Sequence, residues 1–152
     1  MQEVSVIIPN FNGMAYLDGV LAGLECQSVN NFEVILVDNG SSDGSCAFVA
    51  ARYPWVHLIE LPENFGFCKA VNEGIKASRA PYVLLLNNDI EVTENFIEEM
   101  IFAIKRHPKA FSCAARMIQF HDRDKLDDAG NYYCALGWAY ARGKGKDIHI
   151  YE

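Results

Sequence analysis

The sequence predicts an α/β fold: a mostly parallel, twisted sheet with helices on both faces. Short runs rich in β-branched residues alternate with stretches in which apolar residues recur at helical spacing. The runs are apolar almost throughout, which is typical of strands that are buried on both faces of a parallel sheet. The 152 residues are enough for one domain with a sizeable core.

Five strands are expected, each bounded by polar or turn-forming residues. They cover residues 4–9, 32–38, 56–61, 82–86 and 111–118. The run at 82–86 (YVLLL) is apolar or aromatic at every position, so we expect it to be covered on both faces.

Four helices are expected between these strands. The first covers residues 16–26, the second begins near Ser45 after a polar turn at 39–44, the third follows the turn at 64–66, and the fourth begins after Thr93. The apolar residues expected to face inward are Leu17, Val20, Leu21 and Leu24 in the first helix, Phe67, Ala70, Val71, Gly74 and Ile75 in the third, and Phe96, Ile97, Met100, Ile101 and Ile104 in the fourth.

Composition excludes several classes of protein. The formal net charge of −7 argues against a general nucleic-acid binder, which would present a basic face. The five cysteines are scattered and form no Cys-x-x-Cys pair, so reduced thiols in the cytoplasm are expected. No apolar run approaches the ~20 residues of a transmembrane helix. Work at the cytoplasmic face of a membrane is compatible with these features.

Polar residues gather where three of the predicted strands end. The first strand leads into Asn10-Phe11-Asn12-Gly13, the second into Asp38-Asn39-Gly40-Ser41, and the fourth into Asn87-Asn88-Asp89. Each segment alone could be only a turn, since Asn and Gly tolerate positive φ. In a parallel sheet, however, the three ends lie along one edge, where open α/β sheets bind ligands.

The chemistry of these residues suits a nucleoside diphosphate. The Asp38 carboxylate can accept a hydrogen bond from N3–H of a pyrimidine, and Phe11 offers an apolar surface for the base. Asp89 offers a hard oxygen ligand for Mg²⁺ or Mn²⁺, which would bridge the two phosphates. One carboxylate cannot form a tight protein-only site, so we expect metal binding that strengthens when the diphosphate is present.

Four segments in this order, VSVIIPNFNG, VILVDNGSSDGS, ENFGFCKAVNEGI and YVLLLNNDIEV, resemble the family-2 inverting glycosyltransferases of the GT-A fold. The resemblance runs from Val4 to about Val92 and is closest to the rhamnosyltransferase-like branch. It implies transfer of a sugar from a UDP- or dTDP-sugar to the hydroxyl of a saccharide or lipid-linked acceptor, as in cell-surface polysaccharide synthesis. The positions that match the family's nucleotide site are Pro9, Asn10, Phe11, Asn12, Asp38, Asn39, Asn64, Gly66, Phe67, Lys69 and Asn88. Asp89 and Asn87 match its metal-binding element, and Lys69 could equally be a solvated helix residue.

The resemblance also implies a general base, which inverting transfer needs for the acceptor hydroxyl. In the family this carboxylate lies further downstream, so we expect it beyond Glu152 and expect a truncated chain. Residues 1–118 would then form the nucleotide-sugar-binding domain, and 119–152 an incomplete start of the acceptor side. Asp127 and Asp128 lie in a charged stretch that reads as a solvated loop, and neither is assigned as the base.

Other readings remain open. Without a base, the chain could be a non-catalytic nucleotide-binding module. A sugar-nucleotidyltransferase would need a Gly-rich, basic loop after the first strand, and an oxidoreductase would need Gly-x-Gly-x-x-Gly there; the sequence has neither. A truncated α/β domain would expose apolar surface, which could drive homodimer formation.

Overall fold

The computed structural model describes residues 2–151, and the chain divides into two compact units, Met1–Glu99 and Met100–Glu152. The boundary falls inside helix α4 (Phe96–Arg106). The first unit contains the predicted sheet. The boundary at residue 118, which separates the nucleotide-sugar-binding domain from the start of the acceptor side, stays a prediction.

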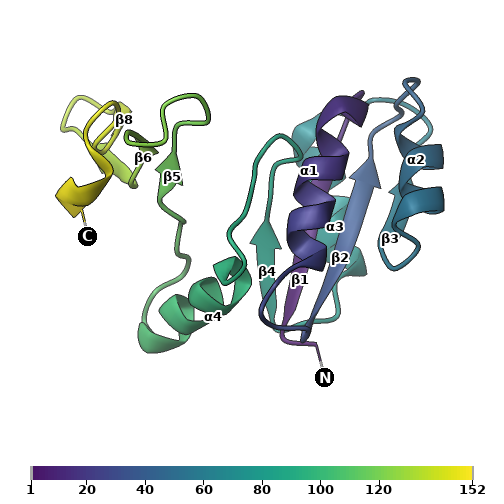
Figure 1. Ribbon diagram of the computed structural model, residues 1–152, viewed down its shortest axis with the longest axis horizontal. Coiled ribbons are helices and arrows are strands. Elements are labelled where there is room, and N and C mark those ends of the chain that lie inside the picture. Colours follow the sequence, from purple (N-terminus) through teal and green to yellow (C-terminus); the bar gives the residue numbers. More distant parts are fainter. Residues whose placement is uncertain (1, 152) are drawn as a thin grey trace. The chain divides into compact units, whose positions relative to one another are not determined.

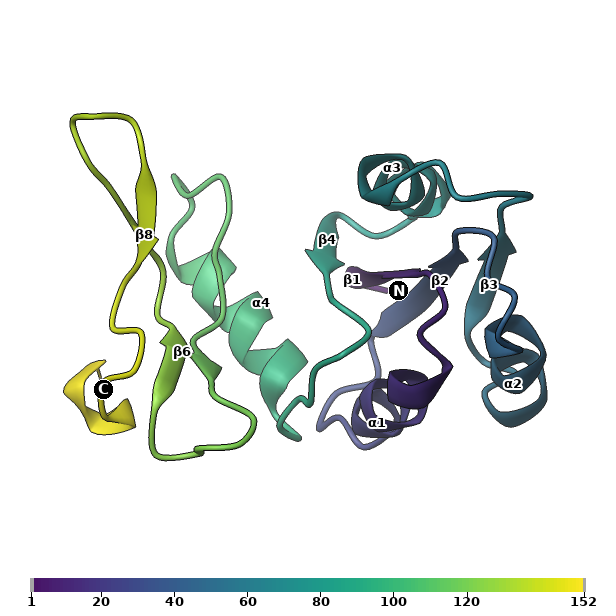
Figure 2. The same ribbon diagram turned by 90° about the horizontal axis from the view of Figure 1, so that it is seen from above.

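The first unit has three layers, as the sequence predicts. Its sheet consists of β1 (Val4–Asn10), β2 (Phe32–Asp38), β3 (His57–Glu60) and β4 (Tyr82–Leu85), all parallel, in the order β3-β2-β1-β4. Helices α1 (Met14–Glu25) and α2 (Ser45–Arg52) cover one face and α3 (Phe67–Ala77) covers the other (Figures 1 and 2). This is the α/β arrangement that alternating strands and helices dictate.

The core of this unit lies between the two central strands and the helices. From Val4 to Ile8 of β1 and from Val34 to Asp38 of β2 every residue is buried. On α3 the buried residues are Ala70, Val71 and Gly74. A methyl group on Gly74 would lie 2.4 Å from Ile7 Cγ2, so the absence of a side chain there lets α3 lie directly on the sheet.

Two predictions of burial in this unit are wrong. Strand β4 has only β1 as a neighbour among the described residues, and Val83 and Leu85 are 43% and 51% exposed, so YVLLL is not covered on both faces. On α3, Phe67 and Ile75 are also exposed, because the narrow stripe around Gly74 makes the contact with the sheet and these two flank it. An apolar run identifies a strand but not how many neighbours it has.

Two side chains that follow α1, Gln27 and Ser28, bond to the start of α4. The Gln27 amide donates to Thr93 O at 2.7 Å, and its oxygen accepts from Ile97 N at 2.9 Å. The Ile97 side chain is fully buried, as predicted for the inward face of this helix. Gln27 therefore fixes where the fourth helix begins.

The second unit contains short antiparallel pairs. Strand β5 (Met117–Ile118) pairs with β6 (Leu126–Asp128), β7 (Asn131–Tyr133) pairs with β8 (Ala139–Ala141), and a 3₁₀ turn covers Ile148–Tyr151. The predicted fifth strand over residues 111–118 is therefore wrong except at its last two residues, and that pairing is antiparallel. Its earlier part, FSCAAR, has no β-branched residue, and Phe111 is fully exposed.

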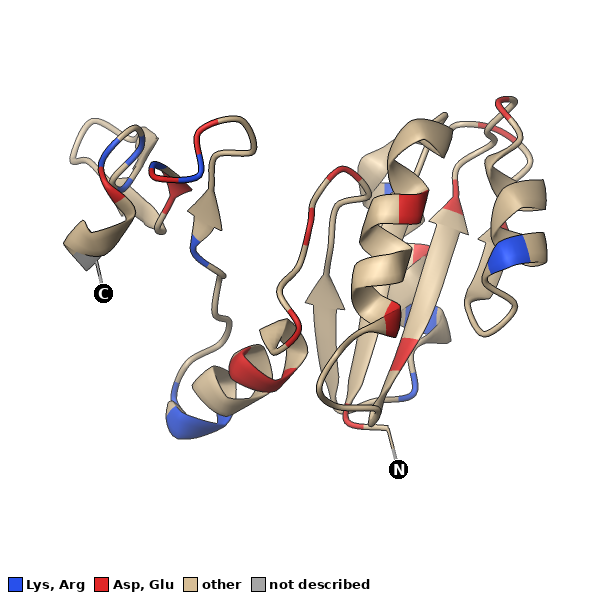
Figure 3. Ribbon diagram, in the orientation of Figure 1, with Lys and Arg blue, Asp and Glu red and all other residues tan. Residues whose placement is uncertain are grey.

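Charge is divided unevenly between the two units. Met1–Glu99 contains 4 Lys and Arg against 14 Asp and Glu, whereas Met100–Glu152 contains 9 against 6. Figure 3 shows this contrast along the ribbon. The net negative charge of the chain therefore belongs entirely to the unit that carries the parallel sheet.

Candidate functional site

The carboxyl ends of three neighbouring strands are joined by one chain of side-chain hydrogen bonds. The Asn10 amide at the end of β1 donates to Asp38 Oδ1 at the end of β2, at 2.8 Å. Asn10 Oδ1 accepts from Asn88 Nδ2, which follows β4, at 2.7 Å. Asn10 and Asp38 are each 2% exposed. The strand ends predicted to share one edge therefore do so.

The loops after β1 and β2 hold each other in place. Asn12, whose φ is +50°, donates its backbone N–H to Ser41 Oγ at 2.8 Å, and its side-chain oxygen accepts from Ser42 N at 2.9 Å. Ser41 N–H in turn donates to Asp38 Oδ2 at 2.8 Å. Asn tolerates this left-handed conformation better than most residues do. The two loops thus form one structure around the Asp38 carboxylate.

A second pair of amides joins the loop after β2 to the start of α3. Asn39 donates to Asn64 Oδ1 at 2.8 Å and accepts from Phe65 N at 3.0 Å. The same Asn64 oxygen accepts from Gly66 N at 2.8 Å. Gly40 allows the close approach, since a methyl group there would lie 2.7 Å from the Glu63 backbone. The polar turn 39–44 is therefore more than a helix cap.

Asp43 satisfies the beginnings of two helices. Its carboxylate accepts from Met14 N, the first residue of α1, at 2.9 Å and from Ser45 N, the first residue of α2, at 3.0 Å. The hydrogen bond from the Ser45 hydroxyl is the main reason that the pKa of Asp43 lies below its ordinary value. A negative charge at two helix N-termini is favourable because both present unpaired N–H groups.

The thiol of Cys46 lies on α2 next to two carboxylates. Burial, and then hydrogen bonding and charge repulsion from Asp38 and Glu60, raise the pKa of Cys46 to about 12. The thiol therefore stays protonated and donates toward carboxylates. It is not a candidate nucleophile, as its sequence context already indicated.

The remaining predicted site residues differ in exposure. Phe11 and Phe67 are 48% and 59% exposed, and Asn87, Asn12, Asn64, Gly66 and Asp89 are also exposed. Pro9 is half-buried, and Asn39 is buried. Lys69 forms an ion pair with Glu73 on the next turn of α3 at 2.7 Å, an arrangement of a solvated helix residue. The buried residues thus support the exposed ones.

The carboxylate set fits an open metal site and not a closed one. Among residues 2–151 no three or more His, Cys, Asp or Glu side chains are grouped so that they could hold a metal ion. Asp89 is a single exposed carboxylate in the turn that follows β4. Hard oxygen donors of this kind bind Mg²⁺ or Mn²⁺ together with phosphate oxygens of a ligand.

Two residues of the site were not predicted as members. Ser41 Oγ accepts from Asn12 N and lies 3.3 Å from Asn10 Nδ2. Gly13 lies under the contact between Asn10 and Asn88, where a methyl group would be 2.1 Å from Asn88 Nδ2. Both belong to the quoted strand-end segments, so their place was visible in the sequence but their partners were not.

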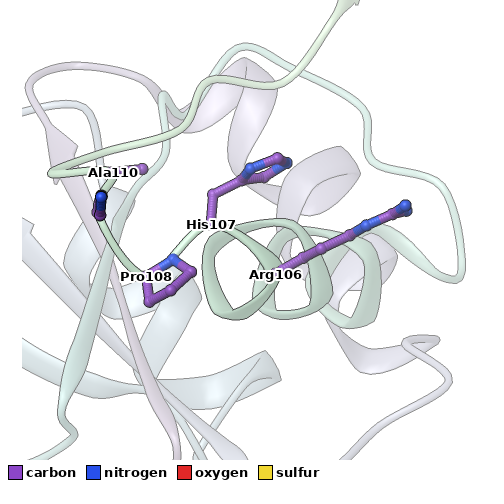
Figure 4. Close-up of a pocket in the computed structure, with 5 residues that line it drawn as sticks. Arg106, His107, Pro108 and Ala110 are labelled. Atoms are coloured by element: carbon purple, nitrogen blue, oxygen red, sulfur yellow. The ribbon is translucent and has the colours of Figure 1, made fainter.

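The acidic residues of the second unit are engaged locally. Asp127 pairs with Lys144 at 3.2 Å, and Asp128 accepts from Gly130 N at 2.7 Å. Both lie on β6 and not in the solvated loop that was expected. A hollow of about 540 Å³ at the end of α4 is lined by residues 106–110 (Figure 4), and none of the predicted site residues lines it.

The parallel sheet with helices on both faces is that of the GT-A fold of glycosyltransferases. TarS of S. aureus in complex with UDP superposes with a TM-score of 0.64 over 70% of this chain and 33% of that chain, at 26% identity. The family model described as Glycosyl transferase family 2 matches residues 5–149, and the chain belongs to this family.

Curated relatives agree with this assignment. The glycosyltransferase GlyG of Streptococcus pneumoniae serotype 4 is 29% identical over 133 residues, which is 86% of this chain and 39% of GlyG. TuaG of Bacillus subtilis strain 168, a glycosyltransferase named for teichuronic acid biosynthesis, is 27% identical over 128 residues, 82% of this chain and 50% of TuaG. The chain therefore spans half or less of the length of these relatives. Within residues 2–151 no helix is long and apolar enough to cross a membrane.

Proposed function

We propose that this chain is the nucleotide-sugar-binding part of an inverting glycosyltransferase, which moves a sugar from a UDP- or dTDP-sugar to an acceptor hydroxyl in cell-surface polysaccharide synthesis. The observation that carries the proposal is the buried Asp38 carboxylate, held at the strand ends by Asn10 and Ser41 in a family-2 chain. The UDP and UDP-GlcNAc complexes of TarS support the choice of donor.

Asp38 would read the pyrimidine base. Two carboxylate oxygens offer about four acceptor sites, and Asn10 and Ser41 use two of them. A remaining site can accept N3–H of uracil or thymine, whereas cytosine has no hydrogen there. Phe11 and Phe67, both more than 40% exposed, would cover the apolar faces of the nucleoside. Asn12, Asn39, Asn64 and Gly66 would shape the loops around it.

The diphosphate would need a cation. The loops that follow the four strands, residues 10–13, 38–44, 61–66 and 87–95, contain no Lys or Arg, and the unit around them is strongly acidic. The only basic side chain of the predicted site, Lys69, is paired with Glu73. Asp89, with Asn87, would therefore hold Mg²⁺ or Mn²⁺ against the phosphates. A divalent cation there would neutralise the charge that develops on the leaving nucleotide.

Finer assignments follow the motifs. Asp38-Asn39-Gly40-Ser41 together with Asn87-Asn88-Asp89 supports the rhamnosyltransferase-like branch. Residues 1–118 would bind the donor, and 119–152 would begin the acceptor side, for a saccharide or a lipid-linked acceptor.

Titration calorimetry with UDP and dTDP tests the proposal. We expect millimolar or tighter binding that Mn²⁺ or Mg²⁺ strengthens by about tenfold, because phosphate oxygens complete the cation's coordination. Asp89→Ala should remove this metal dependence and leave metal-free binding unchanged. Glu94→Ala, a loss of the same charge from an exposed residue of the same loop, should keep it.

Two results would contradict the proposal. Absence of UDP and dTDP binding at millimolar concentration, with metal present, would remove the nucleotide site. An unchanged metal response in Asp89→Ala would exclude this residue as the ligand.

A further inference from the structure

Asn10 is only 2% exposed and connects the two ends of the proposed site. Its amide lies between Asp38 on one side and Asn88 on the other, at 2.8 Å and 2.7 Å. We propose that Asn10 is a positioning residue. Because its NH₂ group donates to Asp38, its oxygen faces the NH₂ group of Asn88, and the Asn88 oxygen is left as a further ligand for the cation. This inference rests on the proposed function.

The order of donors and acceptors follows from Asp38. A carboxylate can only accept hydrogen bonds, so the Asn10 atom that faces it must be the NH₂ group. The Asn10 oxygen then faces Asn88, which must in turn offer its own NH₂ group. The amide oxygen and nitrogen are separate branches of the same carbon, so Asn88 Oδ1 is not the atom that faces Asn10.

This leaves an oxygen available next to the proposed metal ligand. Among the described residues Asn88 Oδ1 has no hydrogen-bond partner, and Asn88 is only partly buried. It precedes Asp89 directly. An amide oxygen is a ligand that Mg²⁺ and Mn²⁺ accept, whereas an NH₂ group in the same place would repel a cation.

The tight space around the relay favours a single arrangement. A methyl group on Gly13 would lie 2.1 Å from Asn88 Nδ2 and 2.4 Å from Asn10 Oδ1. Ser41 Oγ, 3.3 Å from Asn10 Nδ2, adds a second acceptor on the donor side of Asn10. The two amides therefore have little room to take other positions.

One isosteric substitution should reverse the relay. In Asp38→Asn the new side chain must keep an oxygen toward Ser41 N–H, so it turns an NH₂ group toward Asn10. Asn10 then has to present its oxygen there and its NH₂ group to Asn88, which turns its own NH₂ group outward. Asp38→Asn should therefore weaken cation binding at a residue that it does not touch.

The quantity to measure is the Mn²⁺ gain, the ratio of the UDP dissociation constants without and with Mn²⁺. Loss of the base contact alone weakens both constants equally and leaves the ratio unchanged. The relay predicts that the ratio falls at least about fivefold, the lower end of ordinary coupling between sites. Binding of pyrophosphate with Mn²⁺, which involves no base, should fall in the same way.

A second substitution should restore the gain. In the double variant Asp38→Asn with Asn10→Asp, the carboxylate at position 10 accepts from both neighbouring amides, so Asn88 Oδ1 points outward again. We expect the Mn²⁺ gain to return to within about twofold of the original, while UDP binding itself stays weak. As a control, Asn30→Asp adds the same negative charge as Asn10→Asp, but at an exposed residue outside the site. It should change neither the Mn²⁺ gain nor UDP binding.

The outcomes separate the inference from the proposed function. If the unaltered chain does not bind UDP, the proposed function fails. If it binds UDP and Asp38→Asn keeps the full Mn²⁺ gain, or the double variant does not recover it, the relay is wrong. Thermal unfolding of each variant identifies any that has lost its fold, and Mn²⁺-pyrophosphate binding by the folded ones then decides.

Discussion

At the scale of single residues, Cys46 shows how neighbours set chemical character. Burial, and then the nearby carboxylates of Asp38 and Glu60, raise the pKa of its thiol from the ordinary value of 9.0 to about 12. Cys26, Cys68 and Cys113 are exposed. Nothing in the sequence distinguishes the reactivity of Cys46 from that of the other three cysteines. The difference comes from the packing of α2 against the strand ends.

Cys46 should accordingly react slowly with alkylating agents. A three-unit rise lowers the thiolate fraction about a thousandfold, and the greater nucleophilicity of the thiolate offsets roughly twentyfold of this. We expect Cys46 to react with iodoacetamide at pH 8 at least tenfold more slowly than Cys26 or Cys68. Peptide mass spectrometry over a time course measures this; equal rates for the three thiols would show that Cys46 lies in a different environment.

Residue types at the site were predictable, and their partners were not. The strand-end positions of Asn10, Asp38 and Asn88 follow from parallel topology. Which side chains become partners depends on how the loops after the strands lie in space, and no sequence spacing encodes this. Asn10 was expected to hold the nucleoside, which stays a prediction, and its bonds to Asp38 and Asn88 were not expected.

At the scale of elements, α3 depends on the absence of one side chain. Gly74 lies over Ile7 and Val37, and a methyl group would be 2.4 Å and 3.2 Å from their Cγ2 atoms. Both of these residues are fully buried and cannot move away. The helix would therefore have to shift away from the sheet to accommodate alanine.

Gly74→Ala should lower the free energy of unfolding by about 1–2 kcal/mol, because overpacking outweighs the gain of about 1 kcal/mol in helix propensity. Gly19→Ala is the matched control: Gly19 is exposed in α1 and a methyl group there meets nothing within 4 Å. It should raise stability by about 0.5–1 kcal/mol. Urea unfolding of both variants measures the difference; a stable Gly74→Ala would mean that α3 does not pack as closely as described.

Strand and helix positions were predicted best where periodicity was long. The four strands of the first sheet and its three covering helices lie within a few residues of their expected places. The segment 111–118 failed because a strand also needs a partner, and a short mixed run carries no information about one. Whether a strand lies at the edge or in the centre of a sheet likewise depends on the other strands. This is why the exposure of β4 was predicted wrongly.

At the scale of the whole molecule, four titrating groups bound the pH range of stability. Asp43 has a lowered pKa, and the pKa of Glu73 falls to about 2 mainly through hydrogen bonds from Lys69 and Lys76. Burial and the neighbouring Asp18 raise the pKa of Tyr53 to about 12, as the surroundings of Cys46 do for its thiol. The carboxylates of Asp43 and Glu73 affect stability at low pH, and the Tyr53 hydroxyl and the Cys46 thiol affect it at high pH.

The melting temperature should therefore be highest on a plateau at intermediate pH. Depressed carboxylates stabilise the fold above their ordinary values of 3.8 and 4.5 and lose this contribution as pH falls, in the case of Glu73 toward a pKa of about 2. Raised groups stabilise it below their ordinary values of 9.0 and 10.0 and lose this contribution as pH rises toward 12. Calorimetric scans from pH 3 to 11 measure both flanks, and Tyr53→Phe should flatten the alkaline one; a melting temperature that still rises above pH 10 would contradict the assignment.

The hydrogen-bonded trio of positions 10, 38 and 88 has a consequence for how such chains can diverge. An isolated exchange at one of them must either turn the amides of the other two or leave like groups facing each other, and the second outcome costs more than the lost bond itself. A change at one of these three sites therefore alters what the other two present, so descendants of this sequence should vary there in a correlated way.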